Sequence, residues 1–323
     1  MAPGVRPRPR PGTTMHSSLR RPRLMPTRQL AACAWVALAA ALWLPTGDAA
    51  AQDGPLAPVT SEPLRQPANL KMHGAIFAAG AATIATVGAL QSQLAPASCR
   101  WCDLHDDGTD ALNGLDRAVR DALLWQHPDT ASTVSDALAF GVVPASVLGI
   151  SAWAAHAEGQ GDDIKVDMLV IGETVVLAAN AAALLKYATA RQRPHAHARA
   201  LGESVTVAPG SSDNLSFSSG HVAFAFAMTV SAAEVATLRG RRRAAGWIWG
   251  VGLPAAAAVG YFRIAGDRHY LTDVLASAGI GAAIGYFLPR VVFKVRPPGS
   301  PPGARVTVAP LLSGSLIGVS CAW

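Results

Sequence analysis

Six apolar stretches separated by polar segments dominate the chain beyond its first seventy residues. They are rich in Ala and cover roughly residues 74–90, 138–157, 166–190, 221–239, 246–263 and 272–293. Each is longer than an ordinary strand, and none shows the strict alternation of apolar and polar positions that half-buried strands have. The pattern therefore predicts an all-α protein, a bundle of about six main helices.

The segments between these stretches predict shorter elements. Residues 99–136 are polar, and we expect a short amphipathic helix in them around Leu115–Trp125. Residues 195–217 are rich in Gly, Ser and Asn and predict a loop. From Arg296 the chain is rich in Pro and Gly, which cannot continue a helix. Residues 305–323 have a β-like composition and predict a short C-terminal tail, either a small hairpin or a loose end.

The first 51 residues are typical of a secretory signal peptide. Residues 1–30 contain seven Arg and no Asp or Glu, the apolar run 31–44 follows, and Ala49, Ala50 and Ala51 come soon after. A basic segment, a short apolar run and a small-residue site have this order in signal peptides, so we expect cleavage after Ala51. The chain then divides into a signal peptide (1–51), a polar lead-in (52–73), a helical domain (74–294) and a Pro/Gly linker with a tail (295–323).

The positive charge of the chain belongs to this leader. Residues 1–51 carry seven Arg and one Asp, a net charge of +6, and the whole chain is also +6. Residues 52–323 are therefore close to neutral, and we expect no nucleic-acid partner. Cys99 and Cys102 stand three apart without a second pair, which favours a local disulfide in an exported protein over a zinc site and leaves Cys321 over.

The apolar stretches have the length that a membrane span needs, but polar residues interrupt them. Glu173, Asn180, Glu234 and Arg263 lie within them, and the buried helices of a soluble bundle would look similar. We expect the protein in the cell envelope, either in the periplasm or in a membrane with a site that faces the periplasm.

Two ways of counting crossings disagree. The positive-inside rule places Arg239 and Arg241–Arg243 in the cytoplasm and Lys186 on the exported side. A cleaved leader followed by six spans would instead put Lys186 inside. Either one stretch does not span, with 74–90 the weakest candidate, or the bundle does not cross a membrane.

A first group of polar residues follows the third apolar stretch. Lys186 and Arg193 are seven apart, which corresponds to two helical turns and one helix face, and Pro194 would end that helix. A guanidinium and an ammonium together can clamp a dianion. The alternative is that both side chains only stabilise the helix end or extend toward the solvent.

A second group precedes the fourth stretch, which begins at His221. Ser216, Ser218, Ser219 and Gly220 come directly before it. Ser is a favoured N-cap, and the free N–H groups of a helix start bind anions. The alternative is an ordinary capped helix start with an incidental histidine.

A third group joins the last two stretches. His269 and Asp273 are four apart, which would place both on one helix face within reach of each other. A carboxylate that bonds one ring nitrogen makes the other a better nucleophile. Arg263 lies just before them in an apolar setting, which is costly unless it binds an anion. The alternative is a surface His–Asp pair.

Together these groups resemble the type 2 phosphatidic acid phosphatase superfamily, which includes bacterial class A acid phosphatases and vanadium haloperoxidases. The family pattern is K-x6-R-P, P-S-G-H and S-R-x5-H-x3-D. This chain has K-YATARQ-R-P, S-S-G-H and F-R-IAGDR-H-YLT-D, with Ser218 and Phe262 as the departures. The resemblance covers roughly residues 74–293, and it implies a helical bundle with the active site at one end.

The resemblance also implies roles for the motif residues. His269 would attack phosphorus and form a phosphohistidine, Asp273 would orient it, and His221 would protonate the leaving oxygen and then act as a base. The residues that would hold the phosphoryl oxygens are Lys186, Arg193, Ser219, Gly220 and Arg263. No metal ion or other cofactor is implied.

We therefore expect a metal-independent phosphatase that acts on a phosphate monoester or pyrophosphate. Its substrate would be a phosphorylated lipid or a small phosphate ester, and the apolar bundle favours a lipid and membrane association. The alternatives are a vanadate-dependent haloperoxidase and a non-catalytic exported protein that binds phospholipid.

Two further pairs of residues attract attention. His195 and His197 could bind a metal or a headgroup, although exposed loop positions are the simpler interpretation. Trp101 and Trp125 suit a lid or interface, and ordinary packing is again simpler.

Overall fold

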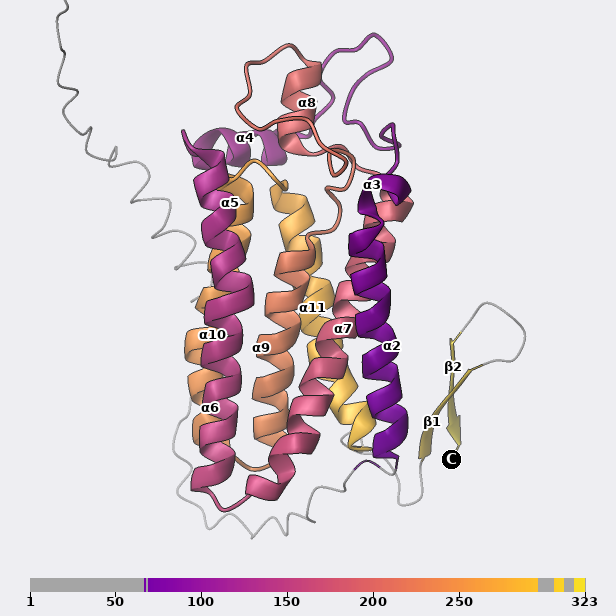
Figure 1. The fold of residues 1–323 in the computed structure, drawn as a ribbon, viewed down its shortest axis with the longest axis vertical. Coiled ribbons are helices and arrows are strands. Elements are labelled where there is room, and N and C mark those ends of the chain that lie inside the picture. Colours follow the sequence, from indigo (N-terminus) through magenta and orange to yellow (C-terminus); the bar gives the residue numbers. More distant parts are fainter. Residues whose placement is uncertain (1–66, 68, 296–304, 311–316, 323) are drawn as a thin grey trace, which may run out of the picture.

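The structure is a computed structural model, and it describes residues 67, 69–295, 305–310 and 317–322 (Figure 1). The predicted signal peptide, most of the predicted lead-in and most of the linker lie outside the described residues.

Long helices lie side by side along one axis and confirm the all-α bundle that the apolar stretches predict (Figure 1). One of these long helices is made of three consecutive segments, α5, the π-helical turn η1 and α6, which follow one another without a break. Their bounds are α2 Leu70–Ala89, α5 Pro128–Ala137, η1 Leu138–Val142, α6 Val143–Ala157, α7 Ile164–Thr189, α9 Gly220–Leu238, α10 Arg242–Ala265 and α11 Leu271–Val292.

Short helices lie at the two ends of the bundle. They are α3 Gln91–Leu94, α4 Gly114–Leu123, η2 Gly161–Asp163 and α8 Pro194–Ala200. The amphipathic helix expected around Leu115–Trp125 is present as α4. The expected loop at 195–217 is wrong in its first part, because Pro194 starts α8, and proline is well suited to the first position of a helix.

At the C-terminus, β1 (Arg305–Pro310) and β2 (Ile317–Ala322) pair antiparallel, with Arg305 opposite Ala322. The residues between the two strands lie outside the described chain. The β-like character of the tail stays a prediction from its sequence.

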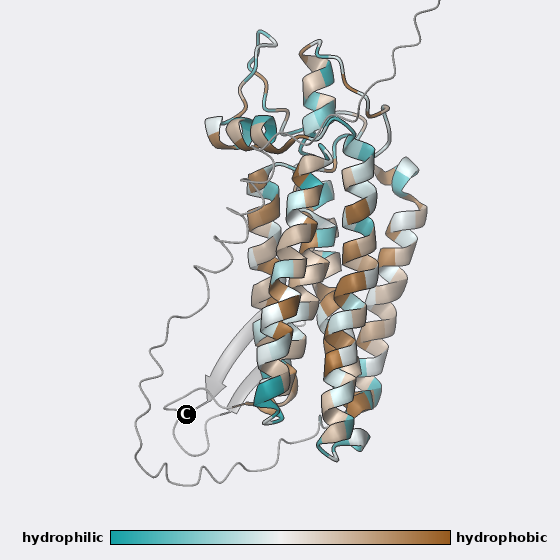
Figure 2. Cartoon of the chain, turned by 90° about the vertical axis from the view of Figure 1, so that its left-hand side faces the viewer, coloured by the Kyte–Doolittle hydropathy of each residue, from teal (hydrophilic) through white to brown (hydrophobic). Residues whose placement is uncertain are grey.

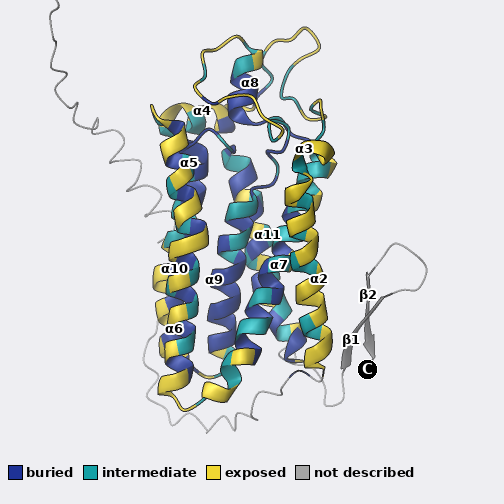
Figure 3. Cartoon of the chain, viewed as in Figure 1, coloured by how far each residue is buried: buried dark blue, intermediate teal, exposed yellow. Residues whose placement is uncertain are grey.

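The helix α9 lies at the centre of the bundle, against α7, α10 and α11, and it is buried along most of its length (Figure 3). Small residues let α11 approach it closely. A Cβ atom at Gly281 would overlap the carbonyl oxygen of Ala223, and one at Gly285 would lie 2.9 Å from Cβ of Val230. Glycine is therefore required where these two backbones meet.

Apolar positions are frequent along the other long helices (Figure 2), and large apolar side chains also lie on their outer surfaces. Trp153, Leu184, Trp247 and Phe287 all have exposed side chains. Among the described residues, 6 helical segments are long and apolar enough to cross a membrane. Soluble monomers rarely expose so much apolar surface, so the bundle is a membrane-associated one.

The two ends of the bundle differ (Figure 1). The helices α3, α4 and α8 lie at one end, which we call the cap end. The starts of α2 and α10 and the turn η2 lie at the other, which we call the base end. The three motifs all lie at the cap end, because α7 and α10 finish there and α9 and α11 begin there.

Candidate active site

The helix ends bring the three sequence motifs together at the cap end. Lys186 is in the last turn of α7 and Arg263 in the last turn of α10, while His269 lies in the short loop between α10 and α11. The charges of Arg193, Arg263, Lys186 and His221 all act on the ring of His269. Residues that are up to 83 positions apart in the sequence therefore form one cluster of cations and imidazoles.

Lys186 and Arg193 do not share a helix face, contrary to the prediction from their spacing. The helix α7 ends at Thr189 because Ala190 adopts a left-handed conformation, with φ of 45°. The next residue, Arg191, forms a β-bridge with Trp101, and Arg193 is the N-cap of α8. The two cations therefore reach the cluster from different elements.

His269 also lies outside a helix, because α11 starts at Leu271 with Tyr270 as its N-cap. Its Nδ1 is 2.7 Å from the carbonyl oxygen of Ser216 and 3.9 Å from Oδ2 of Asp273. A carbonyl oxygen can only accept, so Nδ1 carries the proton and Nε2 keeps the lone pair. The nearest partner of the ring is thus a backbone group rather than the carboxylate.

Asp273 supports the position of His269 indirectly, through Ser216. Its Oδ2 accepts a hydrogen bond of 2.5 Å from the hydroxyl of Ser216 and one of 3.0 Å from the N–H of Tyr270. Because Ser216 holds His269 through its carbonyl and Asp273 through its hydroxyl, the carboxylate fixes the segment that orients the ring. The sequence pattern found Asp273 but not this intermediate role of Ser216.

The surroundings of His269 keep its imidazole neutral. Burial, followed by the charges of Arg193, Arg263 and Lys186, holds the pKa of His269 well below its usual value. Burial and the neighbouring Arg263 and Arg268 also lower the pKa of Arg193 to about 9. A neutral ring with a free Nε2 has the form that a nucleophile requires.

Several polar atoms of the cluster are buried without a hydrogen-bond partner in the described part of the chain. They are Nε of Arg193, Oγ of Ser218, Oγ of Ser219, Nε of Arg263 and Nε2 of His269. Buried polar groups are nearly always paired, so a group of unpaired ones calls for an explanation. Most of these atoms are donors, and an anion with several oxygens would satisfy them together.

Gly220 and Ser219 lie beside Lys186 and Ser277 at the start of α9. A Cβ atom at Gly220 would lie 3.4 Å from Nζ of Lys186, which is ordinary van der Waals contact, so the ammonium group lies next to the Gly220 backbone. The N–H of Ser219 already donates to Oγ of Ser277 at 2.6 Å, which leaves its hydroxyl as the group available to a ligand.

His221 pairs with an acid that the sequence motifs do not contain. Its Nε2 lies 2.9 Å from Oδ1 of Asp136 in α5, and the same oxygen accepts from Nη1 of Arg263 at 3.1 Å. The ring of Phe140 lies against the imidazole, with 4.9 Å between centroids. Asp136 ends a polar segment, and no spacing in the sequence links it to residues more than eighty positions away.

Behind the cluster, the guanidinium of Arg191 is completely buried among acids. It donates to Asp103 at 3.0 Å, to Asp116 at 3.0 Å and to Asp273 at 2.7 Å. The rings of Trp101 and Tyr270 cover it, at 4.1 Å and 4.3 Å from its central carbon. The signal that could have found Arg191 is a second arginine inside the first motif, with many acids in residues 99–136.

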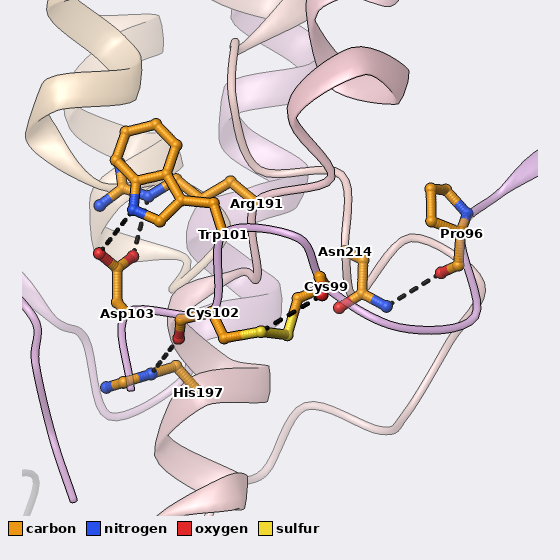
Figure 4. The surroundings of a disulfide bond; sticks show 8 residues. All are labelled: Pro96, Cys99, Trp101, Cys102, Asp103, Arg191, His197 and Asn214. Atoms are coloured by element: carbon orange, nitrogen blue, oxygen red, sulfur yellow. Dashed lines mark hydrogen bonds and ion pairs between the residues drawn. A yellow bond between two sulfur atoms is a disulfide. The ribbon is translucent and has the colours of Figure 1, made fainter. Parts of the chain in front are cut away.

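A disulfide between Cys99 and Cys102 confirms the pairing predicted from their spacing. Figure 4 shows that this short loop carries both Trp101 and Asp103 toward Arg191. The indole N–H of Trp101 donates to Asp103 at 2.8 Å, and Nδ1 of His197 lies 3.1 Å from the carbonyl oxygen of Cys102. The disulfide therefore restrains the loop that covers the buried guanidinium.

His195 and His197 are not exposed loop residues, and that prediction was wrong. They lie in α8 with 1% and 3% of their surface exposed. His195 bridges the carbonyl of Asp267 at 2.8 Å and the carboxylate of Asp213 at 3.1 Å, while His197 lies 3.1 Å from Asp110. Both therefore fasten α8 to neighbouring loops, and the described residues contain no group of three metal-ligating side chains.

Trp125 packs as the simpler interpretation predicts. Its N–H donates to the hydroxyl of Tyr261 at 3.1 Å, and its ring meets that of Phe262 at 5.4 Å. Phe262, which departs from the family pattern, is thus part of an aromatic contact.

Comparison with known families agrees with the motifs. Residues 168–297 match the family model described as the PAP2 superfamily, and this range contains all three motifs. The chain matches no curated protein and no solved structure. The segment with Asp103, Asp116 and Asp136 lies outside the matched range.

Replacing Arg191 by alanine should destabilise the protein strongly, because three buried carboxylates would lose their shared counter-ion. Removing one partner of a buried ion pair typically costs about 3–5 kcal/mol. Thermal unfolding of the purified protein in detergent measures the effect, and Arg100→Ala, which removes an exposed arginine of the same cap, is the matched control. An unfolding midpoint of Arg191→Ala equal to that of the control would contradict the role of this cluster.

Proposed function

Because the chain belongs to the type 2 phosphatidic acid phosphatase superfamily, we propose that it is a metal-independent phosphatase with His269 as its nucleophile. Its substrate would be a phosphate monoester or pyrophosphate. Members of this superfamily are generally phosphatases. The substrate, its lipid part and the phosphohistidine intermediate belong to our proposal for this chain.

The observation that supports the proposal most is that cations acting on the ring of His269 carry buried donors with no partner in the described chain. Arg193, Arg263 and Ser219 each direct a donor without a partner in the described chain, and Lys186 lies close by. A phosphoryl group in transfer spreads negative charge over three equatorial oxygens. Fixed donors and cations around one nucleophilic nitrogen match that distribution of charge.

In the first step, the Nε2 lone pair of His269 forms a bond to phosphorus while the bond from phosphorus to the leaving oxygen breaks. The leaving oxygen takes a proton from the imidazolium of His221. Proton donation at this point avoids an alkoxide product, and general acids contribute rate factors of about 10²–10⁴.

In the second step, a water molecule attacks the phosphohistidine and His221 takes a proton from it. The bond between phosphorus and Nε2 breaks, and its electron pair returns to His269. Lys186, Arg193 and Arg263 would offset the phosphoryl charge throughout both steps, so positioning and electrostatics provide the catalysis.

The surface near the site favours a substrate with an apolar part. Leu184, in the turn before Lys186, is 71% exposed, and Phe140, which contacts His221, is 57% exposed. An exposed apolar side chain thus contacts His221 from η1, and another lies in α7 two residues before Lys186. A lipid phosphate would bring its chain to this surface and its headgroup to the cations.

We propose that the cap end faces the exported side of a membrane. The Cys99–Cys102 disulfide at the cap end fits an oxidising compartment. At the base end, Lys165, Arg242 and Arg243 are exposed, as the positive-inside rule requires of a cytoplasmic side. Six crossings then place the start of α2 in the cytoplasm, which conflicts with export of everything after Ala51.

Replacing His269 by alanine should reduce phosphate release by at least about a thousandfold, because the nucleophile is lost. Phosphate release would be measured on a lipid phosphate in mixed micelles and on a soluble ester. His156→Ala, which removes an exposed histidine at the base end, is the control and should keep full activity. Full activity of His269→Ala would contradict the proposal. If the unaltered protein oxidised halide with peroxide and vanadate but hydrolysed neither ester, the haloperoxidase alternative would be favoured.

The orientation can be tested by cysteine labelling in intact cells, after a carbonate wash has shown that the protein stays with the membrane. In a Cys33→Ser, Cys321→Ser background, a membrane-impermeant maleimide should label Asp121→Cys at the cap end. It should label Arg243→Cys at the base end only after permeabilisation. The reverse pattern would place the site in the cytoplasm.

A further inference from the structure

Asp136 meets two members of the candidate site, although neither the motifs nor the family match includes it. Its Oδ1 lies 2.9 Å from Nε2 of His221 and 3.1 Å from Nη1 of Arg263. One turn earlier, Oγ of Ser132 lies 3.2 Å from the same nitrogen of Arg263. The last turns of α5 thus contact the site residues at the start of α9 and the end of α10.

We propose that Asp136 is the positioning residue of the general acid, holding the ring of His221 by Nε2 and countering the positive charges around it. This inference rests on the phosphatase function proposed above and adds a residue to it. With Nε2 held by the carboxylate, Nδ1 is the nitrogen left to give its proton to the leaving oxygen as the bond from phosphorus to that oxygen breaks.

The other charges that face His221 make such a partner necessary. Lys186 from α7 and Arg263 from α10 both act on its ring, and His269 and Arg193 belong to the same cluster. Positive neighbours disfavour the imidazolium, which is the form that a general acid must have before transfer. A carboxylate in contact with the ring counters them directly.

Asp136 itself can carry the negative charge at low cost. Its side chain is 52% exposed, so water still solvates it, and Arg263 and Arg268 both act on it. The contact with Arg263 also fixes the carboxylate, because the guanidinium and the imidazole approach the same oxygen. The ring of His221 is therefore held against a charge that is itself held in place.

The π-helical turn η1 gives the ring its second contact. It follows α5 directly and carries Phe140, four residues after Asp136, whose ring lies 4.9 Å from that of His221 and 5.3 Å from that of Phe224. Single π-helical turns are frequent at functional sites because they shift side chains relative to a regular helix. Here the turn places an aromatic ring against the imidazole that Asp136 contacts from the last turn of α5.

The test compares Asp136→Asn on two esters with leaving groups of different basicity. An alkyl phosphate such as dodecyl phosphate needs a proton on its leaving oxygen, whereas the nitrophenolate of p-nitrophenyl phosphate leaves without one. We expect kcat/KM to fall about a hundredfold on the alkyl ester and less than about threefold on the aryl ester. Asp136→Glu should restore part of the activity on the alkyl ester.

Asp129→Asn is the matched control. Asp129 lies on the same helix as Asp136, but its carboxylate accepts from Arg268 and has no described contact with His221. It should leave both values of kcat/KM unchanged. Circular dichroism of each variant confirms that the helices are retained.

Four outcomes would overturn the inference. An equal loss on both esters would mean that Asp136 acts on phosphate binding through Arg263. A lower KM on both esters without loss of kcat would mean that the carboxylate merely occupies the place of the substrate anion. Full activity of Asp136→Asn on the alkyl ester would remove its role while leaving the phosphatase function intact, whereas no hydrolysis by the unaltered protein would remove both.

Discussion

The buried guanidinium of Arg191 is the interaction on which the cap end depends. It joins carboxylates from three separate segments: Asp103 beside the disulfide, Asp116 in α4 and Asp273 at the start of α11. A charge in so dry a place is tolerated only when its donors are all used, and here they are shared among acids and covered by two aromatic rings. Because Asp273 in turn holds Ser216, which holds His269, the geometry of the candidate nucleophile follows from this one cation.

A second constraint is the concentration of positive charge in front of that cluster. Arg193 and Arg263 both act on Lys186, and the lowered pKa of Arg193 reflects its burial first and then repulsion from Arg263 and Arg268. Such an arrangement costs stability in the free protein, as functional sites commonly do. An anion bound among the three cations would relieve the repulsion, so the same feature that weakens the fold prepares the site for a phosphoryl group.

The sequence predicted most of the helices, because long apolar stretches are local signals, and its motifs named residues that the fold brings together at the cap end. The sequence-based predictions were wrong or incomplete where contacts between residues far apart in the chain determine the position of a side chain. Arg193 was placed on the face of α7, but the left-handed Ala190 and the bridge between Arg191 and Trp101 redirect the chain. His195 and His197 looked like loop residues because the partners that bury them are far away in the sequence. Asp136 was missed for the same reason, since it is 85 positions from His221.

The most direct test of the central claim is to find the phosphoryl group on the protein during turnover. A reaction with substrate would be stopped in alkali, where phosphohistidine survives, and the peptides analysed by mass spectrometry. We predict a phosphoryl group on His269, absent from His269→Ala and more abundant in a variant whose second step is slowed, such as His221→Ala with p-nitrophenyl phosphate. Hydrolysis that proceeds with no phosphorylated His269, or with the group on another residue, would contradict the claim.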